Sequence, residues 1–325
     1  MIKAIAKGAV QLGFGRAPGG AALYRALTRG GHGLGTAASH VDKLARVWPG
    51  YVATWRRFGI ELEGRALWLH DPGATPFLPF AAFMLAGRGA VLTGDEAMLP
   101  RYLDRARAGA LDAAWPAGAV PDARRRVIEG VRWLSIGEAL AVVGAGCERE
   151  ASAIRDDSID LCHSGGALEH ESPAELAAFL ADQARALRPG GVSSHVYDHR
   201  DHLHHADNRI AFFAHLAWPE SVYRAVLGHR LGFHARLAPA EVSASFERAG
   251  LERIAVRRLI YDAHSGERRW VDDDKAALAG APGIARSHLA PRFRGWSEAD
   301  LRTAAGHYLY RKRAPQTGPS AQGVG

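Results

Sequence analysis

The sequence predicts an α/β fold whose core is a doubly wound, mostly parallel sheet of seven strands. From Arg65 onward, short apolar runs alternate with longer segments of helical periodicity. The segment 173–187 also has a complete helix start, with Ser172 as the N-cap and Glu175 in the first turn. Strands that alternate with helices pair as a parallel sheet through right-handed crossovers.

The seven expected strands are short apolar runs bounded by turn residues. They lie at residues 66–70, 90–93, 139–144, 159–163, 192–197, 251–259 and 307–311. The helices expected between them lie at residues 76–86, 98–108, 173–187 and 239–250. Gly250 is the natural C-cap of the last helix.

The chain divides into three parts. Residues 1–60 are expected to form a helical, amphipathic lead. Residues 61–313 form the domain that holds the sheet. Within it, residues 198–238 are expected to be an insertion or lid, because they contain no clean strand and are rich in histidine and aromatic residues. The tail 314–325 is rich in Pro, Gly, Ser and Gln and is expected to be disordered.

Composition restricts the function classes. The chain has 325 residues, of which 47% are hydrophobic. This is enough apolar material for one large core or a core with a small appendage. The net charge is +7. Cys147 and Cys162 form neither a disulfide framework nor a metal-binding pair, which fits a reducing, cytoplasmic compartment.

The apolar runs are too short for a membrane span. The densest basic run, residues 124–126, lacks the interleaved aromatic residues of a nucleic-acid platform, so no nucleic-acid partner is expected. No pattern indicates an oligomeric state.

A small-residue turn follows the first expected strand and contains Gly73. Asp95 lies about 20 residues further on, at the end of the second expected strand. In doubly wound sheets the ligand binds outside the carboxyl ends of the strands, and a carboxylate at this spacing accepts hydrogen bonds from ribose hydroxyls. The pair therefore predicts a nucleotide-type ligand. A plain strand-to-helix turn and a solvated acidic turn are the alternatives.

Four short motifs follow one another between residues 150 and 191. They are Glu150-Ala151, Asp157-Ser158-Ile159-Asp160, Ser164 with Leu168-Glu169-His170, and Leu187-Arg188-Pro189-Gly190-Gly191. In this order and spacing they resemble the class I S-adenosylmethionine-dependent methyltransferases of the type 11-like group. The resemblance covers roughly residues 50–260 and the last strand. It implies a Rossmann-like fold and S-adenosyl-L-methionine as the cofactor.

The resemblance also implies a set of cofactor contacts. These are Leu69, Asp71, Gly73, Asp95, Glu150, Ala151 and Ser164. The first motif departs from the family pattern, because Leu69 stands at its acidic position and Asp71 at its first glycine. Asp71 could contribute the missing carboxylate, but it also adds a Cβ at a position where the cofactor is expected to approach the backbone closely. These departures bear on cofactor affinity rather than on the fold.

Methyl transfer is an in-line displacement in which the protein positions two reactants and can remove a proton from the acceptor. The candidate bases are His170, Asp198, His199 and His202. A structural, helix-capping role is the alternative for His170. For residues 198–205 the alternative is a divalent-metal site. A single run of eight residues rarely completes a closed site, so a solvated or substrate-facing loop is expected there and no metal is predicted.

The predicted function is methyl transfer from S-adenosylmethionine to a small-molecule or glycan acceptor, the glycan being suggested only by analogy. Two alternatives remain open. The departures at Leu69 and Asp71 suggest a catalytically silent member of the fold that acts as a binding protein. The histidine-rich loop suggests a metal-dependent hydrolase.

Overall fold

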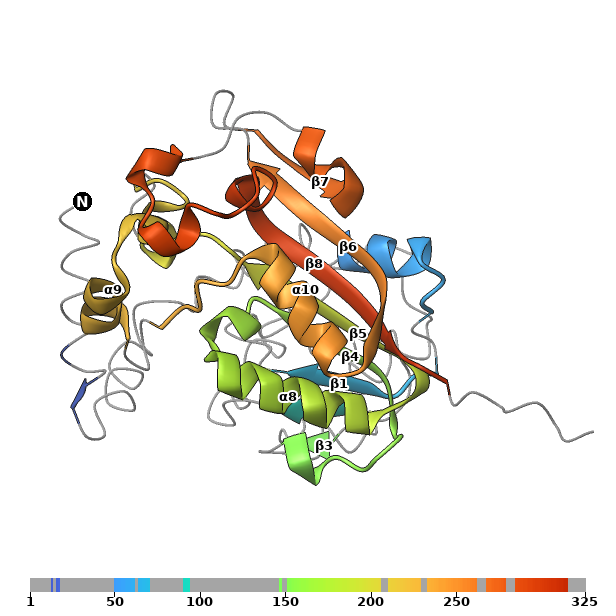
Figure 1. Ribbon diagram of the computed structural model, residues 1–325. Helices are drawn as coiled ribbons and strands as arrows, with labels where there is room; N and C mark the ends of the chain where they lie inside the picture. Colours follow the sequence, from blue (N-terminus) through green and yellow to red (C-terminus); the bar gives the residue numbers. More distant parts are fainter. Residues whose placement is uncertain are drawn as a thin grey trace, which may run out of the picture.

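The computed structural model describes residues 13, 16–17, 50–61, 64–70, 90–93, 146–147, 151–205, 210–228, 233–261, 267–278 and 284–314. These residues form one eight-stranded sheet in the order β3-β2-β1-β4-β5-β8-β6-β7 (Figure 1). The strands are β1 (Leu67–His70), β2 (Ala90–Thr93), β3 (Gly146–Cys147), β4 (Ile159–Gly165), β5 (Leu187–Asp198), β6 (Leu251–Tyr261), β7 (Arg268–Asp272) and β8 (Thr303–Lys312).

The first five strands, from β3 to β5, form a parallel half-sheet. Every neighbouring pair in it is parallel, and Leu69 of β1 lies between Leu92 of β2 and His163 of β4. The order 3-2-1-4-5 is that of the doubly wound nucleotide-binding fold, in which the winding reverses between the first and fourth strands. The predicted α/β class and doubly wound core are therefore present.

The other half of the sheet is antiparallel and holds one strand more than predicted. β8 inserts between β5 and β6, and β7 pairs with the outer edge of β6. The expected count of seven strands is therefore wrong for this sheet. β7 lies in a polar segment, and as an edge strand it can leave Arg268 and Arg269 exposed while it still pairs with β6.

Most predicted strands agree with the structure. β1 starts one residue later than expected, β2 has the expected bounds, and β4, β5, β6 and β8 are longer than expected. The third strand was predicted at residues 139–144, which lie outside the described residues, and the strand described in this part of the chain is Gly146–Cys147. The predicted helices at 76–86 and 98–108 and the tail from residue 315 also lie outside them.

Two helices pack on one face of the sheet, α8 (Pro173–Ala186) and α10 (Pro239–Arg248) (Figure 1). α8 begins as predicted: the Ser172 hydroxyl accepts from the Glu175 backbone at 3.3 Å, and the Glu175 carboxylate accepts from the Ser172 backbone at 2.8 Å. Apolar side chains from both helices and the sheet form the main core, among them Trp68, Leu176, Phe179, Phe246 and Tyr308.

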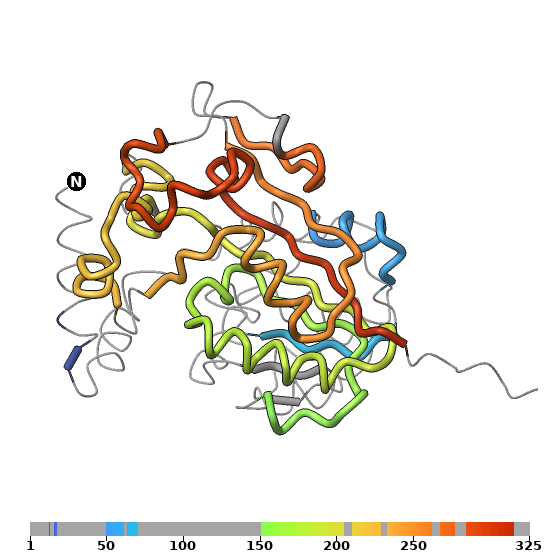
Figure 2. The backbone as a smooth tube through the Cα atoms, in the orientation of Figure 1, coloured from blue at the N-terminus to red at the C-terminus, as the bar shows by residue number. Residues whose placement is uncertain are grey.

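The described end of the N-terminal lead contacts the sheet. Residues 50–57 are helical (blue in Figure 2), and the side chain of Trp55 is 1% exposed. Its indole donates to the hydroxyl of Ser194 on β5 at 2.8 Å. The ring of Tyr51 lies edge-on against His163 of β4, with 4.8 Å between the ring centroids. This helix is therefore packed against the strands β4 and β5.

The predicted insertion, residues 198–238, begins at the last residue of β5, and its other described residues contain short helices and no strand. They are η5 (His202–His205), η6 (Ala214–Ala217) and α9 (Glu220–Leu227). A second apolar cluster joins this segment to residues 284–301 through Phe212, Phe213, Leu216, Leu289, Phe293 and Leu301. That it acts as a lid stays a prediction. No helix in the described part of the chain is long and apolar enough to cross a membrane.

Candidate functional site

The candidate site lies at the edge of the sheet where parallel strands end. β1, β4 and β5 end at His70, Gly165 and Asp198. Because the three strands are parallel neighbours, their carboxyl ends meet at one edge, at the point where the winding reverses. Two short helices follow directly, η4 (Leu168–His170) after β4 and η5 after β5.

Three of the seven predicted cofactor contacts fall among the described residues. Leu69 is 2% exposed, so its side chain belongs to the core of the sheet. Ala151 begins the short helix η3 (Ala151–Ala153), and its carbonyl accepts from Arg185 at 3.1 Å. The other four, Asp71, Gly73, Asp95 and Glu150, lie outside the described residues.

Ser164 is the third. Its hydroxyl lies 2.7 Å from Nδ1 of His195, and Nε2 of His195 lies 2.5 Å from the amide nitrogen of Gln183 on α8. In the neutral tautomer that satisfies both contacts, His195 donates to Ser164 and accepts from Gln183. The Ser164 side chain therefore points into the core, and the residue pairs with His195 of β5 in the sheet.

A tight turn after β4 brings a carboxylate to this edge. Gly166 has a φ of 81°, and a Cβ there would lie 3.2 Å from the Glu169 carboxylate, so both conformation and space favour glycine. Glu169 itself is 2% exposed. Burial, and then the nearby charge of Asp198, raise the pKa of the Glu169 carboxyl well above its usual range.

Glu169 is a candidate functional residue that belongs to the Leu168-Glu169-His170 motif but was not among the predicted site residues. Its Oε2 atom is buried and has no hydrogen-bond partner among the described residues. Such an atom is costly in a folded protein and indicates a missing partner. The signal available in the sequence was a carboxylate next to Leu168, in a turn directly after a buried strand.

Asp198, a predicted base, is part of a bidentate ion pair. Nε and Nη2 of Arg200 lie 2.8 and 2.5 Å from its two carboxylate oxygens. The Arg200 backbone also donates to Oδ1 of Asp198 at 2.9 Å. Both oxygens are thus held by a cation, an arrangement that orients Arg200 and stabilises the ionised carboxylate.

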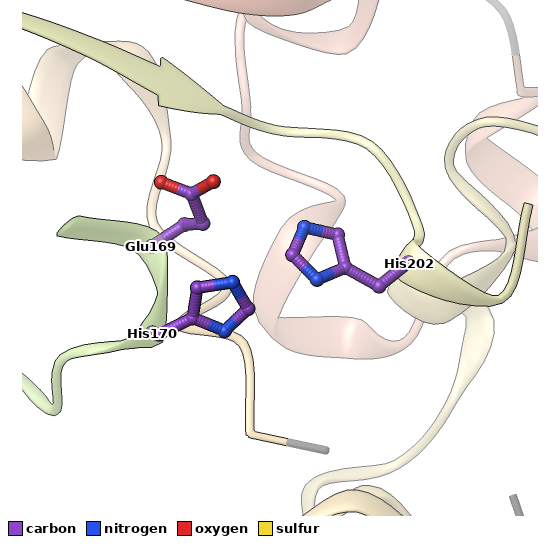
Figure 3. A group of neighbouring side chains, drawn as sticks. All are labelled: Glu169, His170 and His202. Carbon is purple, nitrogen blue, oxygen red and sulfur yellow. The ribbon is translucent and has the colours of Figure 1, made fainter. Parts of the chain in front are cut away.

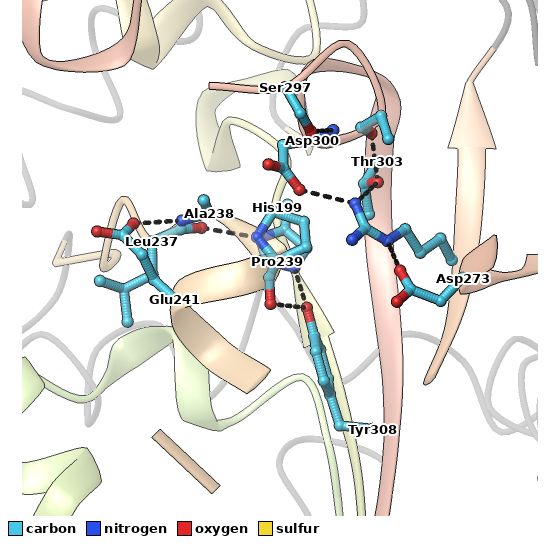
Figure 4. Close-up of polar contacts among 12 residues, drawn as sticks. His199, Leu237, Ala238, Pro239, Glu241, Asp273, Ser297, Asp300, Thr303 and Tyr308 are labelled. Atoms are coloured by element: carbon cyan, nitrogen blue, oxygen red, sulfur yellow. Dashed lines mark hydrogen bonds and ion pairs between the residues drawn. The ribbon is translucent and has the colours of Figure 1, made fainter. Parts of the chain in front are cut away.

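His199, the next predicted base, is bonded inside the protein through both ring nitrogens (Figure 4). Nδ1 lies 3.1 Å from the Leu237 carbonyl, and Nε2 lies 2.9 Å from the Tyr308 hydroxyl. Burial, reinforced by the nearby His234, lowers the pKa of His199 to about 3. The side chain therefore connects the end of β5 to β8 and to the segment that precedes α10, and leaves no nitrogen for an acceptor.

His170 and His202 lie side by side at the same edge. His170 is exposed, and its Nδ1 lies 2.9 Å from the Phe233 carbonyl. The two ring centroids are 4.8 Å apart. Together with Glu169, each of the two histidines offers a ligand atom, and these atoms all lie within 4.8 Å of one another (Figure 3). The structure thus brings two of the four predicted bases together with a buried carboxylate.

No family model and no curated protein matches the chain. Solved structures that resemble it include a protein designated a sarcosine dimethylglycine methyltransferase from Galdieria sulphuraria, with 15% identity, a TM-score of 0.43 and coverage of 82% of this chain and 86% of that one. An S-adenosylmethionine-dependent methyltransferase from Mesorhizobium loti has 16% identity, a TM-score of 0.40 and coverage of 83% and 99%.

A third structure is phosphoethanolamine N-methyltransferase 2 of Haemonchus contortus in complex with S-adenosyl-L-methionine. It has 14% identity, a TM-score of 0.41 and coverage of 82% of this chain and 53% of that one. All three similarities are distant. The functional assignment therefore rests on the sheet order and on the residues at the edge described above.

Proposed function

We propose that this chain transfers a methyl group from S-adenosylmethionine to a small-molecule or glycan acceptor. One observation carries the proposal: the motifs that resemble the methyltransferases lie at η3, at the start and end of β4, in the turn after it and at the start of β5. These elements flank the reversal of winding between β1 and β4, where doubly wound folds bind their ligands.

The end of β4 carries no side chain at two consecutive positions, Gly165 and Gly166. A Cβ at Gly165 would lie 3.0 Å from the Tyr51 hydroxyl, and one at Gly166 would lie 3.2 Å from the Glu169 carboxylate, so glycine at both positions lets these two polar groups reach the strand end. In this proposal the backbone at Leu69 and Ser164, together with Ala151, holds the cofactor. Asp71, Gly73, Asp95 and Glu150 keep their predicted roles, with Asp95 on the ribose. The cofactor would supply an electrophilic methyl group.

The remaining task for the protein is to orient the acceptor and remove its proton. Among the predicted bases, His170 suits this task best because it is exposed, and a proton held on Nδ1 by the Phe233 carbonyl leaves Nε2 as an acceptor. His202 is the second candidate at the same edge. Asp198 orients Arg200, and His199 stabilises the packing of β5.

Calorimetric titration with S-adenosylmethionine, and separately with its demethylated product, tests the proposal. We expect saturable binding of both ligands below the millimolar range. No binding at millimolar ligand would contradict methyl transfer and favour the silent binding protein.

The Asp95→Ala variant tests the ribose contact. We expect affinity to fall at least about tenfold, since a hydrogen bond to a charged group contributes about 1.5–3 kcal/mol. Glu252→Ala is the matched control, because Glu252 is an exposed carboxylate on β6 in the antiparallel half of the sheet. Equal affinities of the two variants would mean that the ribose lies elsewhere.

A further inference from the structure

Glu169, His170 and His202 come from two separate segments and converge at one point. Glu169 and His170 belong to the turn after β4, and His202 begins η5 after β5. Gly165 of β4 pairs with Val196 of β5, so the two segments leave the sheet at neighbouring positions. Figure 3 shows the rings of His170 and His202 facing each other with the Glu169 carboxylate beside them, and one ligand atom from each residue lies within 4.8 Å of the others.

The state of Glu169 points to a cation in that space. Its side chain is buried and its Oε2 atom has no hydrogen-bond partner among the described residues. A buried polar atom needs a partner, which for a carboxylate oxygen can be a metal ion, and Arg200 is already engaged by both oxygens of Asp198.

His170 has the hydrogen bond expected of a metal-binding histidine. Nδ1 can donate to the Phe233 carbonyl at 2.9 Å, which fixes the tautomer with a lone pair on Nε2. Histidines that bind metals almost always donate their other ring N–H to a carbonyl or carboxylate in this way, because it orients the ring and raises its basicity.

We propose that Glu169, His170 and His202 bind one divalent transition-metal ion of the zinc class. Two imidazoles and one carboxylate are a ligand set that zinc uses, with a remaining coordination position for water or substrate. Bonds of about 2.0–2.2 Å place tetrahedral ligand atoms about 3.4 Å apart, so side-chain rotation closes the site from its present spacing. The site does not depend on the methyl-transfer proposal: the lone pair on Nε2 of His170 is a base in the metal-free chain and a ligand in the metal-bound one.

The convergence also explains why the histidine-rich run alone could not predict the metal site. Residues 198–205 supply a single member of the cluster, His202. The other two members come from the turn after the neighbouring parallel strand. A closed site therefore needs both segments, which only the β4–β5 pairing brings together.

The test uses the full chain freed of metal with a chelator and then titrated with Zn²⁺ by calorimetry and with Co²⁺ by visible absorption. We expect a single equivalent of each ion to bind, and the Co²⁺ spectrum to show the intense bands of a four- or five-coordinate site. Mg²⁺ should not compete, because it prefers oxygen ligands in octahedral geometry.

Three variants, His202→Ala, His170→Ala and Glu169→Gln, should each weaken Zn²⁺ binding at least tenfold. His288→Ala is the matched control, since His288 is exposed in η8 (Arg286–His288), outside the cluster. This variant should bind Zn²⁺ with the affinity of the unaltered chain. Circular dichroism checks that each variant is folded. The proposal is overturned if neither ion binds the unaltered chain at 100 μM, or if folded His202→Ala and Glu169→Gln bind as tightly as the control.

Discussion

Two groups of histidines in this molecule have opposite surroundings. His163, His195 and His307 lie inside strands and are at most 2% exposed. Burial lowers the pKa of all three, that of His163 to about 4. His170 and His202 instead follow the strands, at the edge where β4 and β5 end. The same side chain is thus a buried core residue within the sheet and, in our proposals, a ligand or base beyond it.

The buried group is held by short hydrogen bonds. Ser194 connects three of its neighbours: its hydroxyl accepts from Trp55 and lies 2.9 Å from Nε2 of His307, and its carbonyl lies 2.7 Å from Nδ1 of His163. The contact with the Ser194 carbonyl requires a proton on Nδ1 of His163, which fixes the tautomer of the neutral ring. The buried histidines are therefore expected to contribute to stability, whereas those at the edge are the ones to which we assign a functional role.

The largest expected loss of stability comes from replacing Trp55, whose ring lies edge-on against His163 of the buried group. Trp55→Ala should lower the free energy of unfolding by about 3–5 kcal/mol, because it removes a fully buried indole and its hydrogen bond to Ser194. Urea denaturation measures the change. Trp270→Ala is the control, because Trp270 is 38% exposed, and it should cost far less. Equal losses would mean that Trp55 is not part of the core.

The next effect is on pH dependence. A histidine whose pKa is lower in the folded chain than in the unfolded one takes up a proton on unfolding, so stability is fully present above about pH 6.5 and is lost as the pH falls toward 4. For His163 the loss is roughly 3 kcal/mol. Denaturation between pH 7 and pH 4 measures it. His163→Gln should flatten the profile, and an unchanged profile would contradict the assignment.

A smaller effect is expected for Gln183, whose amide nitrogen lies 2.5 Å from His195 and whose oxygen accepts from Ser193 at 2.8 Å. Gln183→Leu leaves both partners buried and unsatisfied, and should cost about 1–3 kcal/mol in urea denaturation. Adding Ser193→Ala removes one of the orphaned groups, so the double variant should lose less than the sum of the single changes. Strict additivity would show that the contacts are independent.

The smallest effect is expected at the edge. His170→Ala in the metal-free chain should change the free energy of unfolding by about 1 kcal/mol or less, because the side chain is exposed and loses a single hydrogen bond. Its main consequence should be on ligand binding. A loss as large as that of Trp55→Ala would remove the distinction between the two groups.

Much of the fold could be predicted because its signals are local. The capping box of Ser172 and Glu175 fixes the start of α8, and apolar runs mark most of the strands. β7 was not predicted because this edge strand has no apolar pattern and forms through its pairing with β6.

The site was predicted only in part, for a similar reason. His170 and His202 were selected by residue type, but their proximity depends on the register of β4 against β5. The engagement of His199 with Tyr308 depends on a partner 109 residues away. Burial of Glu169 depends on a turn whose neighbours come from other elements. Such long-range contacts have no signature in a short stretch of sequence.

The indole of Trp55 has a consequence for how the chain is made. Its hydrogen-bond partner, Ser194, lies 139 residues further along. At about 5–20 residues per second, translation needs roughly 7–30 s to reach that partner. During this time a large apolar ring emerges from the ribosome without the surface that covers it. The segment around Trp55 is therefore a candidate for chaperone contact during synthesis, and the motif-bearing domain completes its core only after the nascent chain has extended past β5.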